Sequence, residues 1–104
     1  SLVHRDLSPR WGGGNWETEC PHVVKRGGYY YLFRTQDYSR AQTHVFRSED
    51  PFDFGIGEAE SRFVKTIGVG APEIIVDKSG EEYITSNHDL RGGTHICRLN
   101  WVEE

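Results

Sequence analysis

Apolar positions along the chain fall in short runs, and polar residues and glycines separate them. β-branched and aromatic residues gather in the stretches 23–24, 29–33 and 43–46, which Gly, Asp and Ser bound, as is typical of strands. Gly27-Gly28 is a tight-turn signal between the first two stretches. No segment has a helical period, and the four prolines interrupt any long helix. The pattern therefore predicts an all-β fold of antiparallel strands.

The chain repeats part of itself at an offset of 51 residues. Residues 21–24 (PHVV) match residues 72–75 (PEII), and residues 43–47 (THVFR) match residues 94–98 (THICR) at the same offset. A period of about 50 residues is typical of stacked supersecondary units. Because each unit holds several antiparallel strands, the repeat predicts the blades of a β-propeller.

The repeat predicts two antiparallel four-stranded blades, approximately residues 16–56 and residues 57–104. A propeller ring usually holds about four to eight blades. Two isolated blades would leave edge strands and inner faces uncovered. We therefore expect residues 1–104 to form a partial propeller domain that is completed by the remaining blades of a parent chain. The alternative is a unit that completes itself by pairing.

Charge and composition narrow the class of partner. The 16 acidic and 12 basic residues give a net charge of −4, and the basic residues are scattered. We therefore expect no nucleic-acid partner. No apolar run approaches the roughly 18 residues of a membrane span, so we expect no membrane partner either. The 12% aromatic content excludes a disordered tail.

The cysteines and histidines indicate no metal site. Cys20 and Cys97 lie 77 residues apart and outside any CxxC pair, so we expect free, partly buried thiols, with a disulfide as the alternative. The five histidines have no HxH or HxxxH spacing, which predicts no metal site built by the protein and no cofactor. His44 and His95 occupy equivalent positions of the repeat, which favours a structural role for both.

The stretch TECPHVVKRGGYYYLFRT, residues 18–35, resembles the five-bladed β-propeller glycoside hydrolases. Family 43, the xylosidases and arabinofuranosidases, has a similar Glu-x-Pro-His stretch followed by a Gly-Tyr-Tyr-Tyr-Leu strand. Family 32, the invertases and fructanases, has Glu-Cys-Pro at the matching place. Residues 70–86 (GAPEIIVDKSGEEYITS) are similar to the next blade of these enzymes, and residues 92–101 (GGTHICRLNW) to its outer strands. The resemblance covers most of residues 16–101.

The resemblance implies that Glu19 is the general acid, which protonates the leaving glycosidic oxygen. This chemistry needs two carboxyl groups across the scissile bond, one of them protonated near neutral pH. The partner Asp residues of the superfamily lie on earlier blades, so we expect them outside this chain. Asp6 lies only 13 residues before Glu19, too close for a separate blade, and we interpret it as the end of a preceding blade or its linker. The 104 residues alone are then expected to be inactive.

Three further residues are candidate substrate-binding residues. His22 would hydrogen-bond a sugar hydroxyl or orient Glu19, and a half-buried strand histidine is the alternative. Trp16 would stack on a sugar ring, and packing between blades is the alternative. Arg91 would reach a hydroxyl or a carboxylate in a ring cleft, and a solvated loop is the alternative.

The resemblance implies hydrolysis of O-glycosidic bonds in plant or microbial poly- and oligosaccharides, namely arabinosides, xylosides or fructans. It also implies an extracellular or periplasmic location, and a structural calcium is known in the complete ring of some family 43 enzymes. Whether the reaction retains or inverts the anomeric centre depends on the second carboxylate and stays open.

Two other functions fit parts of the sequence. A non-catalytic kelch-like propeller that binds protein or carbohydrate would share the period near 50 residues and the Gly-Gly pair. A glycoside phosphorylase on the same ring would need a basic phosphate pocket, for which Arg34 and Arg91 are the candidates.

Overall fold

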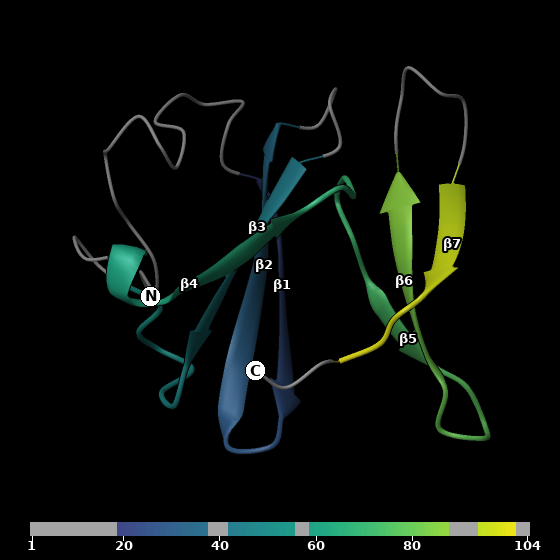
Figure 1. Cartoon of the computed structure of the whole chain (residues 1–104), viewed down its shortest axis with the longest axis horizontal. Coiled ribbons are helices and arrows are strands. Elements are labelled where there is room, and N and C mark those ends of the chain that lie inside the picture. Colours follow the sequence, from purple (N-terminus) through teal and green to yellow (C-terminus); the bar gives the residue numbers. More distant parts are fainter. Residues whose placement is uncertain (1–18, 38–41, 56–58, 88–93, 102–104) are drawn as a thin grey trace.

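Two antiparallel sheets make up the computed structural model, which describes residues 19–37, 42–55, 59–87 and 94–101 (Figure 1). The strand order is β1-β2-β3-β4 in the first sheet and β5-β6-β7 in the second. The elements are β1 (Glu19–Arg26), β2 (Tyr29–Asp37), β3 (Gln42–Ser48), the 3-10 turn η2 (Ala59–Ser61), β4 (Phe63–Ile67), β5 (Ile74–Val76), β6 (Glu82–Asn87) and β7 (Thr94–Arg98).

The all-β, antiparallel prediction is confirmed for the described residues, none of which lies in an α-helix. Within the same ranges the second sheet has three strands, where the repeat predicted four. Strand β4 belongs to the first sheet because it pairs with β3. Its residues nevertheless lie in the stretch 57–104 that we assigned to the second unit.

The two sheets pair their strands in the same register, which is the structural form of the sequence repeat. The offset is 51 residues on the first and third strands and 52 on the second, because five residues separate the paired Val76 and Glu82 whereas four separate the equivalent pair, Lys25 and Tyr30. The equivalent Cα pairs are Val23–Leu32 with Ile74–Ile84, and Tyr31–Arg47 with Tyr83–Arg98.

The four-stranded sheet packs apolar side chains on both of its faces, because successive residues of a strand point to opposite sides. Leu32 packs with Phe46 and Phe54 in one buried cluster. The next residue, Phe33, forms a second cluster with Val45 and with Ile84 of the second sheet. The second cluster therefore holds the two sheets together.

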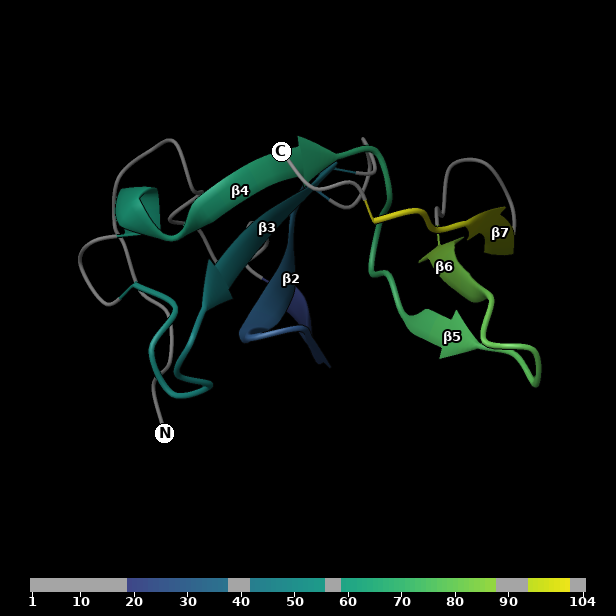
Figure 2. The ribbon, with the colours of Figure 1, turned by 60° about the horizontal axis from the view of Figure 1, so that its bottom comes forward.

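Trp101, just after β7, joins the sheets at a second place. Its ring centroid lies 4.8 Å from that of Tyr31, and its Nε1 donates to Oε2 of Glu82 over 3.0 Å. Arg26 completes this contact, since its Nη1 lies 2.6 Å from Oε1 of Glu82 and its guanidinium lies 4.9 Å from the Trp101 ring. Figure 2 shows the two sheets side by side, with β5, β6 and β7 beside the end of β4.

Candidate functional site

The Glu19 motif begins β1 with a β-bulge. Glu19 pairs with Thr35 and His22 pairs with Phe33, so three steps along β1 oppose two steps along β2. Cys20 lies inside the bulge with a φ of 52°, in the left-handed region that L residues rarely adopt. Bulges re-aim side chains and are over-represented beside active sites. The Glu19 backbone is thus placed at a strained strand start, and its carboxyl group lies outside the part of the chain that the structure describes.

The same kink begins the second sheet. Ala71 is the counterpart of Cys20 at the offset of 51, and it has a φ of 47°. The counterpart of Glu19 is Gly70, which is buried and whose backbone N–H donates to Oγ of Ser86 over 3.0 Å. The kink is therefore common to both units, and what differs is the carboxyl-bearing residue that only the first unit places there.

Two buried threonines fix the second kink beside the first. The hydroxyl oxygens of Thr35 and Thr43 lie 3.2 Å apart and are fully buried. The Ala71 N–H donates to Oγ1 of Thr35 over 2.9 Å, and Oγ1 of Thr43 donates to the Val69 carbonyl over 2.5 Å. Because Thr35 pairs with Glu19, these bonds hold the second kink next to the start of β1.

His22 connects the first strands of the two sheets. Its half-buried ring accepts a hydrogen bond at Nε2 from the Ile74 N–H over 3.2 Å, and its centroid lies 6.5 Å from that of Phe33. A neutral ring that accepts at Nε2 holds its proton on Nδ1. His22 thus has a structural contact, and the predicted contact with a sugar hydroxyl would use Nδ1.

Glu73 belongs to this end of the molecule and was not among the sequence candidates. It is the counterpart of His22, it is exposed, and it comes directly before β5. The exchange of His for Glu between the two repeat units was the signal that could have found it. Two of the candidates, Trp16 and Arg91, lie outside the described residues, as does Asp6.

Arg34 and His44 are core residues. Arg34 is 4% exposed and its guanidinium lies 5.8 Å from the centroid of Phe46, and burial lowers the pKa of this side chain. His44 is 6% exposed, its Nδ1 lies 2.7 Å from Oγ1 of Thr66, and its ring packs 5.8 Å from that of Phe63. His95, the counterpart of His44, is exposed.

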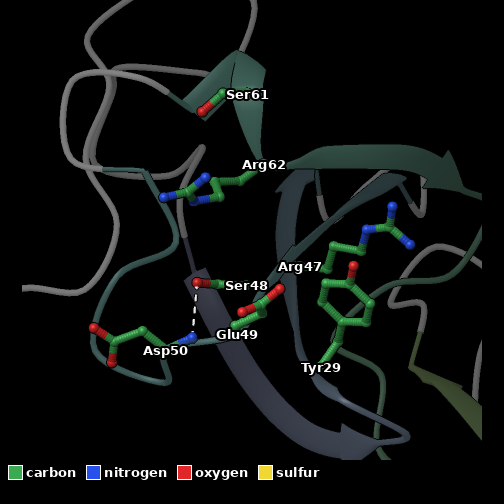
Figure 3. A pocket seen from close by; sticks show the side chains of 7 residues that line it. All are labelled: Tyr29, Arg47, Ser48, Glu49, Asp50, Ser61 and Arg62. Carbon is green, nitrogen blue, oxygen red and sulfur yellow. Dashed lines mark hydrogen bonds between the residues drawn. The ribbon is translucent and has the colours of Figure 1, made fainter.

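A hollow of about 410 Å³ lies at the opposite end of the four-stranded sheet from the bulge (Figure 3). Its charged groups do not converge on one point. The Arg47 guanidinium lies 4.6 Å from the Tyr29 ring, while Arg62 points to the other side, where its Nη2 lies 3.6 Å from Oδ2 of Asp53. The lining residues are Tyr29, Arg47, Ser48, Glu49, Asp50, Ser61 and Arg62.

The described residues hold no group of three or more His, Cys, Asp or Glu that could bind a metal ion. Cys20 and Cys97 are not joined in a disulfide, and both are exposed, so the predicted partial burial was wrong because β7 and the bulge leave them at the surface. In this part of the chain, no helix has the length and apolar character needed to cross a membrane. Comparisons with models of protein families, with curated proteins and with solved structures each give no match to this chain.

Proposed function

We propose that this chain is part of a five-bladed β-propeller glycoside hydrolase and that Glu19 is its general acid. The observation that carries the proposal is the bulge at Cys20, which repeats at Ala71 with the same left-handed φ. The kink is common to both units, whereas a carboxyl residue stands before it only in the first. Strained backbone positions cluster at functional sites. A carboxyl residue that occurs beside only one of two equivalent strained positions therefore supports a role as a single catalytic acid.

The contacts between the two sheets support the propeller arrangement. The Ala71–Thr35 and Ile74–His22 hydrogen bonds bring the starts of both first strands together. In the enzymes that the motif resembles, such strand starts surround the central channel of the ring. Glu19 would then face the central channel, and the remaining blades of the ring would come from the parent protein.

The proposed reaction uses Glu19 together with an Asp from another blade. Protonated Glu19 donates its proton to the glycosidic oxygen as the bond to the sugar breaks, while the Asp activates water or attacks the anomeric carbon. A separation of about 5–5.5 Å between the two carboxyl groups gives retention, and about 6.5–9.5 Å gives inversion. The substrates follow from the resemblance as arabinosides, xylosides or fructans, and so does a location outside the cytoplasm.

The test is a hydrolysis panel on the natural protein that contains these residues, with aryl arabinofuranoside, aryl xyloside, sucrose and inulin as substrates. We expect Glu19→Gln to lower the rate on the natural glycoside by about 10²–10⁴-fold. The loss should be much smaller on an aryl glycoside whose leaving group needs no proton. Glu49→Gln, an exposed acid at the opposite end of the first sheet, is the control and should hydrolyse at the wild-type rate. An unchanged rate in Glu19→Gln would remove Glu19 from the mechanism.

Product analysis separates hydrolysis from phosphorolysis on the same ring. Arg34, one of the two candidate phosphate ligands, is 4% exposed and packs against Phe46, so little of its side chain is accessible to phosphate. We therefore expect free sugar as the product in phosphate buffer. Release of sugar-1-phosphate would show a phosphorylase, and binding without turnover would favour the kelch-like propeller.

A further inference from the structure

The cluster between the two sheets joins faces that are not equivalent in the repeat. The first sheet contributes one face to it, made up of Val24, Tyr31, Phe33 and Val45. Ile84 of the second sheet packs against this face and is the counterpart of Leu32. Leu32, however, lies in the other cluster, on the opposite face of the first sheet. The two sheets are therefore stacked head to tail, as in a heterologous interface.

This stacking leaves one face of the second sheet without a partner sheet among the described residues. The paired residues on the covered face of the first sheet correspond to Ile75 with Tyr83 and to Thr85 with Ile96. We call these four residues the far face, since strand alternation points them away from Ile74 and Ile84. Figure 2 shows the second sheet at the end of the described structure, with the first sheet on one side of it.

The far face has the chemistry of the face that the second sheet covers. Ile96 is the counterpart of Val45, yet Ile96 is 64% exposed and Val45 is 5% exposed. Tyr83 is the counterpart of Tyr31, whose ring centroid lies 4.8 Å from that of Trp101. Each unit of a stacked repeat buries its apolar face against the next unit. The second sheet itself thus shows what kind of surface covers such a face.

A polar contact between the two sheets also has a counterpart on the far face. His22 accepts a hydrogen bond from the Ile74 N–H over 3.2 Å. Glu73 is the counterpart of His22, and it precedes Ile75 by two residues, so strand alternation places both on the same face. A carboxylate is also an acceptor, so the exchange of His for Glu keeps the ability to accept an N–H from a neighbouring strand.

We propose that the far face is the docking surface for a third unit of the same repeat, which packs on it as the second sheet packs on the first. The third unit presents apolar residues at the positions equivalent to Ile74 and Ile84, and an aromatic ring that covers Tyr83. Its source is the parent chain, because only residues 68–73 separate β4 from β5 and a covalent link raises the effective concentration far above that of a second copy. The source rests on the further blades of the proposed function, whereas the docking needs no catalysis.

Thiol labelling of the natural protein tests whether the far face is covered. Ile75→Cys and Val64→Cys place thiols at positions that are 44% and 41% exposed in the described structure, so Val64→Cys is a matched control. N-ethylmaleimide is added, and mass spectrometry of the digested protein follows the label at each position. We expect Ile75→Cys to react about tenfold more slowly or less in the native protein, because labelling then requires local opening, and as fast as the control in urea. Ile96→Cys gives a second site on the same face if Ile75→Cys does not fold.

Photo-crosslinking from a benzoylphenylalanine at position 75 then identifies what covers the far face. A cross-link within one polypeptide, to a segment with the apolar strand pattern of residues 72–84, would support the third unit. Cross-links between two copies or to another protein, or equal labelling of Ile75→Cys and Val64→Cys, would overturn it. The hydrolysis panel reports separately on Glu19. Slow labelling in a protein whose rate does not depend on Glu19 would support the docking surface and overturn the proposed general acid.

Discussion

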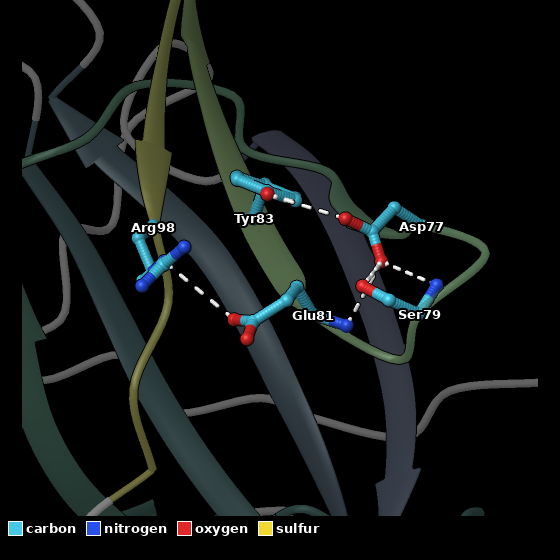
Figure 4. Close-up of polar contacts among 5 residues, drawn as sticks. All are labelled: Asp77, Ser79, Glu81, Tyr83 and Arg98. Carbon is cyan, nitrogen blue, oxygen red and sulfur yellow. Dashed lines mark hydrogen bonds and ion pairs between the residues drawn. The ribbon is translucent and has the colours of Figure 1, made fainter.

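Asp77 organises the turn between β5 and β6 through a single carboxylate (Figure 4). Its Oδ1 accepts hydrogen bonds from the Ser79 hydroxyl over 2.7 Å, the Ser79 N–H over 2.9 Å and the Glu81 N–H over 3.0 Å. Its Oδ2 accepts from the Tyr83 hydroxyl over 3.2 Å. These bonds, led by the one from the Ser79 hydroxyl, lower the pKa of Asp77 below its ordinary value.

The lowered pKa makes the stability of the second sheet depend on pH. The folded-state pKa of Asp77 lies below the unfolded one, so its stabilisation is complete above the unfolded pKa of about 3.9 and disappears as pH falls through the folded pKa. Urea unfolding from pH 7 to pH 2 should show Asp77→Asn less stable than wild type at pH 7, with the gap closing below about pH 4. Glu49→Gln should follow wild type throughout. A gap that stays constant across this range would contradict the prediction.

At the scale of the element, the pairing of β2 with β3 also joins the two sheets. Thr35 and Thr43 lie opposite one another at the kinked end, and both hydroxyls bond the segment 69–71 that leads into β5. The equivalent pair on the second sheet is Asn87 and Thr94, in which the Thr94 hydroxyl donates to Oδ1 of Asn87 over 2.6 Å. The first pair is buried, and Thr94 is exposed.

This difference predicts unequal effects of the same substitution. Thr43→Val leaves the Val69 carbonyl without its donor and should lower the free energy of unfolding by about 1–3 kcal/mol. Thr94→Val removes an exposed bond that water replaces, and should lower it by less than about 1 kcal/mol. Urea titration of both variants measures the two values. If both variants lost the same free energy of unfolding, the buried bond between Thr43 and Val69 would stabilise the protein no more than the exposed bond of Thr94 does.

At the scale of the whole molecule, β7 is the least protected strand of the described structure. All five of its residues are exposed, and Ile96 is 64% exposed. The equivalent strand β3 is flanked by β2 and β4 and is mostly buried. An edge strand with an exposed apolar side chain is a template for pairing with another strand.

The 104-residue polypeptide should therefore self-associate through β7 when it is isolated. Ile96→Lys places a charge on this edge and should restore the monomer, as measured by sedimentation velocity at concentrations up to about 100 μM. Phe52→Lys is the control, because Phe52 is 67% exposed but lies in a turn. A monomeric wild type, or equal effects of the two substitutions, would show that the edge of β7 does not drive association.

The sequence by itself determined the strands and their repetition. Runs of β-branched and aromatic residues between glycine and polar turns specify extended segments through local preference. The matches between 21–24 and 72–75 and between 43–47 and 94–98 predicted two repeated antiparallel units, and the structure then showed that the two sheets share a register. The sequence likewise marked Glu19 and His22 as places where the two units differ.

Only the tertiary structure decided which residues meet. His44 and His95 are equivalent in sequence, yet His44 is buried and packs against Phe63 of β4 while His95 is exposed, because β3 lies between β2 and β4 whereas β7 is an edge strand of the described structure. The left-handed kink at Cys20 and the hydrogen bond from Ile74 to His22 were also hidden from the sequence. Contacts between residues distant in the chain, such as His44 with Phe63 and His22 with Ile74, decide which side chains are buried and which lie together, and no local pattern encodes these partners.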